Sequence, residues 1–458
     1  MSEAHRFADL TPLLNPASIA IVGATPDPKK VGGRPIRYLR RYGYRGRIYP
    51  INPKYDVVQE MPCFAALDGL PERPDMAIIA LPADAAIEAV KTCVAAGIPA
   101  LTVYSSSFRE IGALGEAREA KLKAALAGSA TIMCGPNCQG VANFHAPMVA
   151  YFTSGLGRED VPVGGIGFVT QSGLFGGLLA ETCVKRGLGL GYMISSGNEA
   201  GIDFADAIVH MAADPRTTVI AGYLEGVGDL ARLDEALVRA TARGLPVVIL
   251  KIGRHVEAAR AALAHTGAAT GSLSDYEAMF RRHGVIQVAD IEILYDVIET
   301  LLCDSPRPTG RRVAIITNSG GVGALCADQA RGLGLDVPSF LPETEATLRA
   351  HLPDFASPRN PVDMTLQPFS DPLSLGAHVR AVAADPNVDI VLVFVGLNWL
   401  TGQEMAATLA GLKSSLAKPM MVVWAGGDPK GAEALRAAGL PTFDGARRAL
   451  EVVQALTR

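Results

Sequence analysis

The strongest constraint on the fold is a pattern that occurs three times, in which a short apolar run enters a loop of small residues. The three occurrences read AIVGATPDPKK from Ala20, GFVTQSGLFGG from Gly167 and AIITNSGGVGA from Ala314. Helical patterns follow these loops, and strands buried on both faces of a parallel sheet read as short apolar runs of this kind. The pattern predicts an α/β protein with open parallel sheets. No fixed period links the three, so they share an architecture rather than form a repeat.

Strands and helices alternate in three series along 458 residues, a length too great for one apolar core. The first series predicts strands at 18–23, 48–52, 76–82 and 99–105. It also predicts a helix over 83–97, which ends on glycine, and it closes near 142–148. The second series ends by Leu302, and the proline-rich stretch 303–312 predicts a linker before the third. We therefore expect three domains, over 1–150, 151–304 and 305–458.

Composition excludes several classes of protein. The net charge of −4 with interspersed signs leaves no basic patch for nucleic acid, and the most apolar strand-like run, 389–397, is too short for a membrane span. The first residues show no signal-peptide pattern, and seven irregularly spaced cysteines do not form a disulfide framework. The CGPNC stretch lacks the CxxC spacing of a metal site, so we expect no bound metal. These features predict a soluble, reduced, cytoplasmic protein.

The loops that follow the strands are candidate anion sites, because a helix that begins there points unpaired N–H groups outward. The loop 23–33 is not GxGxxG, but Lys29 and Lys30 suit a phosphate; a nucleotide site and a purely structural turn both remain open. Gln171, Ser172 and Gly173 would lie at the first turn of a helix and form an anion cradle. The third loop, 317–323, has similar residues but no charged residue nearby to corroborate such a site.

His265 has two interpretations. It ends a helical pattern that is followed by Gly267, and a histidine there interacts favourably with the helix dipole. Alternatively its imidazole accepts a phosphoryl group, since the small residues around it, with Thr266 and Gly267 next in sequence, leave the ring accessible. Such a ring needs a carboxylate to orient it, and Glu225 follows a strand of the same predicted domain.

Taken in order, the motifs resemble the α subunit of nucleoside-diphosphate-forming acyl-CoA synthetases, the superfamily of succinyl-CoA synthetase. The resemblance extends from about Ser18 to Thr457. The matching stretches are SIAIVGATPDPKKVGG, IYPINPK, AIIALPA, CGPNCQG, GFVTQSG, SSGNEAGIDFADAI, YLEGV, KIGR, AHTGAATGS, TNSGGVG and NPVDM. It implies an N-terminal Rossmann-like CoA-binding domain followed by two flavodoxin-like domains.

The resemblance also implies roles for individual residues. His265 would be phosphorylated during turnover, Glu225 would hold its ring, and the helix start at Gln171, Ser172 and Gly173 would face the phosphoryl group, with Thr266 and Gly267 beside it. The residues implied for CoA are Gly23 and the loop after it (Ala24, Thr25 and Lys29), then Pro53, Lys54, Pro82 and Asn137.

The implied reaction joins a carboxylic acid to CoA while a nucleoside triphosphate becomes a diphosphate and phosphate. The nucleotide, ATP/ADP or GTP/GDP with Mg²⁺, is expected on a separate ATP-grasp β subunit, because the three series leave no room for that domain. The implied assembly is α2β2. Neither the acid nor the choice of nucleotide is readable from the sequence.

Several positions depart from the family pattern. Ala264 stands where serine usually precedes the histidine, SSSFRE at 105–110 lies near the expected CoA thiol, and MTLQPFS follows NPVD. Two other functions therefore stay open: a CoA- or acyl-CoA-sensing module without catalysis, and a CoA transferase that uses no nucleotide.

Overall fold

The structure is a computed structural model that describes residues 7–158, 160–255, 257–258, 272–365 and 371–458. The chain divides into two compact units, Met1–Ala289 and Asp290–Arg458. The three predicted domain ranges therefore stay a prediction, and each unit is described here by itself.

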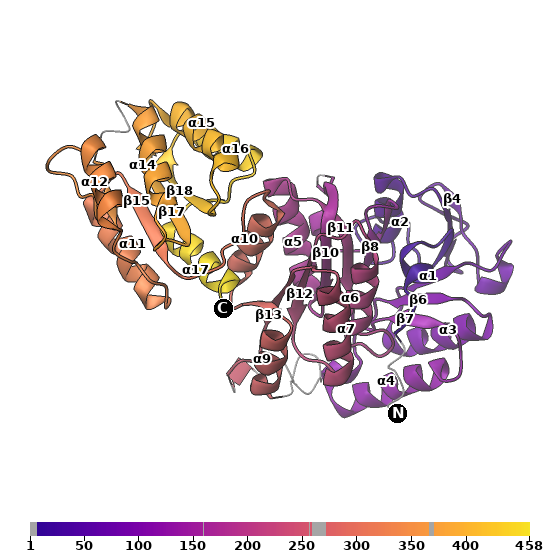
Figure 1. Cartoon of the computed structure of the whole chain (residues 1–458). Coiled ribbons are helices and arrows are strands. Elements are labelled where there is room, and N and C mark those ends of the chain that lie inside the picture. The colour runs from indigo at the N-terminus through magenta and orange to yellow at the C-terminus, as the bar shows by residue number, and fades with distance from the viewer. Residues whose placement is uncertain (1–6, 159, 256, 259–271, 366–370) are drawn as a thin grey trace. The chain divides into compact units, whose positions relative to one another are not determined.

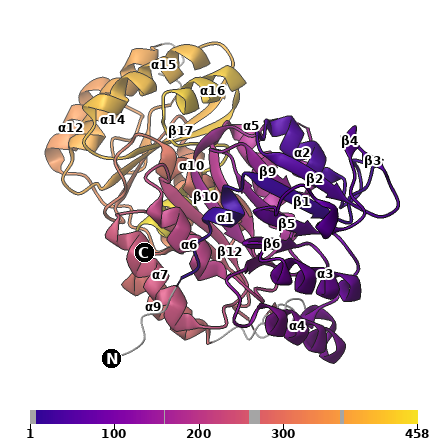
Figure 2. The same cartoon turned by 90° about the vertical axis from the view of Figure 1, so that its right-hand side faces the viewer.

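The first sheet of the first unit is fully parallel, with strand order β2-β1-β5-β6-β7. Its strands are β1 (Ser18–Val22), β2 (Arg47–Ile51), β5 (Met76–Ile79), β6 (Ala100–Val103) and β7 (Ile132–Cys134). The main helices around it are α2 (Arg34–Tyr42), α3 (Ala83–Ala95) and α4 (Ala113–Leu126), and Figure 2 shows α3 and α4 side by side. The predicted strands and the helix at 83–97 are confirmed.

Smaller elements complete this region. They are α1 (Thr11–Leu14), the hairpin strands β3 (Val57–Val58) and β4 (Met61–Pro62), and the short 3₁₀ helices η1 (Leu67–Gly69), η2 (Arg109–Ile111) and η3 (Ser154–Leu156). Helix α1 links the two sheets of this unit, because the amide of Asn143, on a strand of the second sheet, donates to the Leu14 carbonyl (3.1 Å).

The second sheet has the order β14-β13-β12-β10-β11-β8-β9. Its parallel strands are β10 (Val163–Thr170), β11 (Leu190–Ser195), β12 (Val219–Leu224), β13 (Val247–Lys251) and β14 (Ile286–Val288). The helices are α5 (Gly173–Arg186), α6 (Phe204–Ala213), α7 (Leu230–Ala242) and α9 (Leu273–Arg282). The strand order and right-handed crossovers put α5 on one face and α6 and α7 on the other, where Figure 1 shows the latter two adjacent.

One stretch of the second sheet differs from the prediction of an all-parallel sheet. Strands β8 (Gly140–Asn143) and β9 (Met148–Tyr151) form an antiparallel hairpin, and β8 pairs antiparallel with β11. The segment that was expected to close the first series therefore extends the second sheet. This pairing joins residues about 50 positions apart, which local sequence patterns do not encode.

The second unit contains a parallel sheet of order β16-β15-β17-β18-β19. Its strands are β15 (Val313–Thr317), β16 (Val362–Asp363), β17 (Ile390–Asn398), β18 (Met420–Gly427) and β19 (Thr442–Phe443). The other elements are α10 (Ile291–Leu302), α11 (Gly320–Gly332), α12 (Pro342–His351), α14 (Pro372–Ala384), α15 (Gly402–Leu412), η4 (Lys413–Ser415), α16 (Pro429–Ala437) and α17 (Ala446–Leu456). The predicted linker lies between α10 and β15.

Each unit has its own apolar core. In the first unit one cluster runs through both sheets, from Ile19 and Val141 to Tyr192 and Ile249, and in the second unit Val393 and Leu409 belong to a separate cluster. Burying a side chain of this size contributes roughly 1.5–3 kcal/mol. None of the helices in the described part of the chain has the length and apolarity needed to span a bilayer.

Candidate functional site

The junction between β10 and α5 forms the predicted anion cradle. Ser172 is the N-cap residue of α5 and Gly173 is the first helical residue, and the Ser172 side chain makes no capping hydrogen bond. The turn is fixed instead by Thr170, whose hydroxyl accepts from the Ser172 N–H (3.0 Å) and donates to the Ser172 carbonyl (2.7 Å). The first N–H groups of this 14-residue helix therefore stay available for an anion.

A cavity of about 410 Å³ lies at this helix start. It is lined by Val31, Tyr104, Ser106, Asn137, Cys138, Gln139, Phe152, Gln171, Ser172, Gly173 and Leu174. A Cβ atom on Gly173 would lie 2.7 Å from Cγ of Gln139, so glycine allows the two segments to pack closely. None of these described lining residues is charged. The positive potential at the cavity therefore comes from the N-terminal end of the α5 dipole.

Glu225 comes to the same edge of the sheet as the cradle. It follows β12, which pairs in parallel with β10, so the two strands end together. Its side chain is buried, and its N–H donates to Oε1 of Gln171 (2.6 Å). Sequence reasoning thus grouped Gln171, Ser172, Gly173 and Glu225 as the structure groups them. His265, Thr266 and Gly267 lie outside the described residues, so their roles stay predictions.

Two titratable residues beside this edge were missed by the sequence reasoning. Burial lowers the pKa of Lys251 to about 8, although the charge of Glu225 opposes this shift, and the Lys251 ammonium donates to the Glu225 carbonyl (2.7 Å). Desolvation inside the protein raises the pKa of Glu199 to about 8, and its carboxyl oxygen Oε1 accepts from Nε2 of Gln171 (2.8 Å). Both residues lie in stretches that match the family, KIGR and SSGNEAG, but neither stretch reveals these side-chain contacts.

Four of the residues expected to bind CoA line one of two cavities. Gly23, Pro53 and Lys54 line a cavity of about 460 Å³ at the carboxyl ends of β1 and β2. Asn52, which was not predicted, also lines it, and its amide donates to the Ala24 carbonyl (2.8 Å). Asn137 lies instead at the 410 Å³ cavity with Ser172 and Gly173.

The other residues proposed for CoA do not line the 460 Å³ cavity. Ala24 is buried, Lys29 is exposed, and the Thr25 hydroxyl accepts from the Asp27 N–H (3.4 Å). Pro82 is the N-cap residue of α3 and directly follows Leu81, which does line the cavity.

The two cysteines of CGPNC are buried structural thiols. Cys134 donates to the Ser195 carbonyl (3.2 Å) and Cys138 to the Val103 carbonyl (3.3 Å). The neighbouring Cys138 thiol and, after it, burial raise the pKa of Cys134. No group of three or more metal-ligating side chains occurs among the residues that the structure describes.

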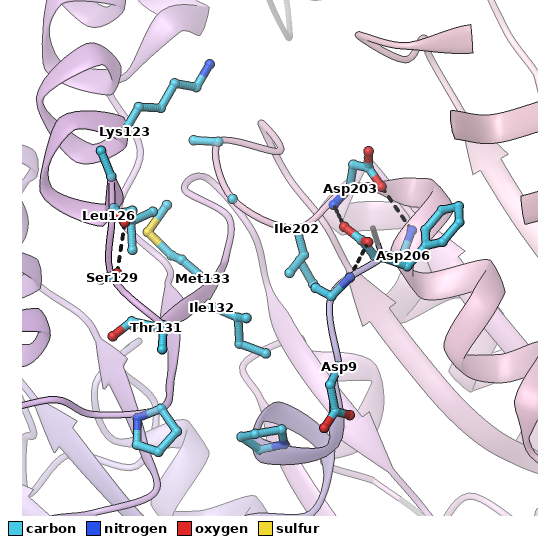
Figure 3. A pocket seen from close by; sticks show the side chains of 18 of the residues that line it. Asp9, Lys123, Leu126, Ser129, Thr131, Ile132, Met133, Ile202, Asp203 and Asp206 are labelled. Carbon is cyan, nitrogen blue, oxygen red and sulfur yellow. Dashed lines mark hydrogen bonds between the residues drawn. The ribbon is translucent and has the colours of Figure 1, made fainter. Parts of the chain in front are cut away.

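A larger cavity, of about 1040 Å³, is lined by a different set of residues (Figure 3). Lys123 and Thr131 lie on one side of it, and Asp203 and Asp206 on the other. Those two carboxylates form the capping box of α6 and pair with Arg232, which accounts for them structurally. None of the predicted site residues lines this cavity.

Three domains of known protein families match successive regions of the chain, one region for each large sheet. Residues 17–143 match a CoA binding domain, residues 163–301 a succinyl-CoA ligase like flavodoxin domain, and residues 313–428 a ligase-CoA domain. The cradle and Glu225 lie in the second of these regions, and the 460 Å³ cavity lies in the first.

Curated relatives match almost the whole chain. The α subunit of acetate–CoA ligase [ADP-forming] I from Pyrococcus furiosus is 32% identical over 98% of this chain and 97% of its own length. This chain belongs to the ADP-forming acetate–CoA ligase family. Its member from Archaeoglobus fulgidus, acetate–CoA ligase [ADP-forming] I, is 33% identical over 97% of this chain, which spans only 63% of that relative's length.

A solved structure from the same family has a similar fold. The dinucleotide-forming acetyl-coenzyme A synthetase 1 of Ca. Korarchaeum cryptofilum, in complex with phosphate and ADP, superimposes with a TM-score of 0.84 at 30% identity. The match covers 98% of this chain and 96% of that one. The fold prediction, a CoA-binding domain followed by flavodoxin-like ligase domains, is confirmed.

Proposed function

We propose that this chain is the α subunit of an ADP-forming acyl-CoA synthetase, an acid–thiol ligase that works through a phosphohistidine at His265. The observation that carries this function is that the α5 start and Asn137 line one cavity of 410 Å³, and that Gln171 of this lining holds the Glu225 turn. A charged phosphoryl group needs such a helix N-terminus, and a histidine nucleophile needs a carboxylate partner.

The reaction we infer proceeds by three transfers. The γ-phosphoryl group of a nucleoside triphosphate moves to a ring nitrogen of His265, and the diphosphate leaves. A carboxylate oxygen of the acid then attacks phosphorus, which frees the histidine and forms an acyl phosphate. The CoA sulfur attacks the acyl carbon, inorganic phosphate leaves, and the thiol proton is released.

The chain's own residues position and stabilise charge in this scheme. The Ser172 hydroxyl and the Gly173 N–H, with Thr266 and Gly267 from the histidine segment, would receive the phosphoryl oxygens, while Glu225 would orient the His265 ring. The 460 Å³ cavity at Gly23, Pro53 and Lys54 would take the nucleotide end of CoA, and Asn137 would lie near its thiol end.

We also propose a partner subunit of the ATP-grasp type that carries the nucleotide and Mg²⁺, in an α2β2 assembly. Two features support it: the Pyrococcus relative is named an α subunit, and the Archaeoglobus relative is much longer than this chain. A reaction that consumes CoA and ATP, together with seven free cysteines, supports a cytoplasmic location.

Phosphorylation of the reconstituted pair tests this function. With [γ-³²P]ATP and a purified ATP-grasp partner, we expect an acid-labile, base-stable label on the wild-type chain and none on His265→Ala. His255→Ala is the matched control, since His255 is exposed and close in sequence, and it should keep the label. Label that persists in His265→Ala contradicts the mechanism, whereas CoA binding without any label would favour the sensing module. Thioester exchange without ATP would instead favour a transferase.

A further inference from the structure

The turn after β12 is held by side chains rather than by strand pairing. The N–H groups of Glu225 and Gly226 both donate to Oε1 of Gln171, at 2.6 and 3.1 Å, and the Val227 N–H donates to the Tyr276 hydroxyl (2.9 Å). A strand that ends leaves its next N–H groups to find other acceptors. The position of Glu225 therefore depends on where the Gln171 amide points.

The Gln171 amide has only one orientation that satisfies its neighbours. Besides the two N–H groups at Oε1, its Nε2 donates to the Gly226 carbonyl (2.5 Å) and to Oε1 of Glu199 (2.8 Å). If the amide were flipped, its NH₂ group would face two N–H donors and its oxygen would face a carbonyl oxygen and a carboxyl. The amide nitrogen has two N–H donors, of which one bonds the Gly226 carbonyl and the other bonds Glu199.

Glu199 is held firmly although it takes no part in the cavity itself. It follows β11 with a φ of 57°, an unfavourable conformation for a residue other than glycine, and its Oε1 also accepts from the Ser196 hydroxyl (2.8 Å). It is absent from the residues that line the 410 Å³ cavity. Its carboxyl therefore acts on the site through Gln171.

We propose that Glu199 is a positioning residue, which fixes the Gln171 amide and through it the turn that carries Glu225. This role rests on the proposed function, in which Glu225 orients the His265 ring. A misplacement of about 1 Å in such an arrangement costs up to about 100-fold in rate. Glu199 thus extends the candidate site from its lining residues to the neighbouring strand β11.

Amide hydrogen exchange on the full chain tests the structural part of this role. The N–H groups of Glu225 and Gly226 exchange only when their bonds to Gln171 open, so their protection reports on the amide directly. Glu199→Gln keeps the length and an acceptor oxygen, and should exchange like wild type. Glu199→Asp keeps the carboxyl but is one methylene too short to reach Gln171, and it should exchange about tenfold faster at these two positions.

Glu119→Gln is the matched control, because Glu119 is a buried carboxylate that accepts from Asn198 (3.3 Å) and does not touch Gln171. In this variant the N–H groups of Glu225 and Gly226 should exchange as in wild type. Protection unchanged in Glu199→Asp overturns the proposal. Aspartate tolerates a positive φ, so the Glu199→Asp variant is expected to fold. Loss of protection in Glu199→Gln would equally overturn the proposal.

Phosphorylation of the same variants, paired with the ATP-grasp partner, tests the functional part. We expect Glu199→Asp to lower the rate of His265 phosphorylation about tenfold with the KM for ATP unchanged, and Glu199→Gln to restore it. Faster exchange in Glu199→Asp with a normal phosphorylation rate overturns the positioning role. Absence of label in wild type refutes the proposed function alone, and exchange still decides whether Glu199 holds the turn.

Discussion

Glu199 and Lys251 flank the Glu225 turn, and at pH 7 both are mainly protonated, so that one is a neutral acid and the other a cation. Desolvation inside the protein raises the pKa of Glu199 to about 8, against the hydrogen bonds from Gln171 and Ser196, so the carboxyl is mainly neutral at pH 7. Burial lowers the pKa of Lys251 to about 8, so most of it still carries a proton at pH 7. The Lys251 ammonium also lies 4.7 Å from the centre of the Tyr276 ring. One turn thus meets a neutral acid on one side and a cation on the other.

The raised pKa of Glu199 makes stability depend on pH. Between its ordinary pKa of 4.5 and about 8, the folded chain binds this proton more tightly than the unfolded chain, so stability falls as pH rises. The loss amounts to at most about 1.4 kcal/mol per pH unit. Glu199→Gln has no such proton, so its free energy of unfolding relative to wild type should increase from pH 5 to pH 8 in urea titrations.

A matched control for this titration is Glu88→Gln, which changes an exposed carboxylate in α3. Its difference from wild type should stay nearly constant over the same range. The charges that act on Glu199 are Asp203, which raises its pKa, and Arg109, which lowers it, and both are unchanged in either variant. A Glu199→Gln difference that is equal at pH 5 and pH 8 contradicts the prediction.

The residues of the site divide into those that the sequence reveals and those that it does not. Gln171, Ser172 and Glu225 follow apolar runs directly, so knowing that parallel strands end at one edge is enough to group them. Glu199 follows β11 and Lys251 is the last residue of β13, but their roles depend on hydrogen bonds that their side chains make with neighbouring segments of the chain. Such contacts depend on strand order and rotamer, which a single sequence does not state.

At the scale of elements, the end of β1 explains why glycine is needed beside the 460 Å³ cavity. Gly23 has a φ of 90°, and its N–H donates to the Ile51 carbonyl (2.9 Å). A Cβ atom here would lie 2.4 Å from the Ala80 carbonyl oxygen, so strands β1, β2 and β5 all constrain this residue. The glycine allows the backbone to approach both a neighbouring strand and the cavity.

Substitution of this glycine separates backbone strain from steric clash. Gly43, which ends α2, has a φ of 82° and nothing within 4 Å of its potential Cβ, so Gly43→Ala should cost only about 1 kcal/mol. Gly23→Ala adds a clash with backbone, and we expect a larger loss of stability together with about tenfold weaker CoA binding. Urea unfolding and calorimetric CoA titration of both variants measure these effects. Equal behaviour of the two would contradict the role of Gly23.

The sequence predicted most elements because their signals are local. The strands at 18–23 and 76–82 are buried on both faces, and helix α3 ends where a glycine follows. The hairpin β8–β9 was missed, because its assignment to the second sheet depends on pairing with β11 rather than on its own residues. Local patterns fix the type of an element more readily than its partner.

At the scale of the whole molecule, the apolar clusters do not follow the boundaries of the three family domains. One apolar cluster of the first unit spans the regions matched to the CoA binding domain and to the flavodoxin domain, whereas the second unit has a separate cluster. The first two predicted domains therefore share a core. We expect them to unfold together and the second unit to unfold separately.

A substitution that destabilises the second unit and a ligand that stabilises the first unit together test whether the two units unfold independently. Leu409 in α15 is fully buried in the core of the second unit, so Leu409→Ala should destabilise that unit by about 2–5 kcal/mol. Leu400→Ala, at a side chain that is 96% exposed, should change little. Saturating CoA should raise only the first unit's transition, because a ligand stabilises the part that binds it. Differential scanning calorimetry should therefore show that Leu409→Ala lowers the temperature of one transition while CoA raises that of the other. A single transition that both perturbations move would show that the two units unfold together.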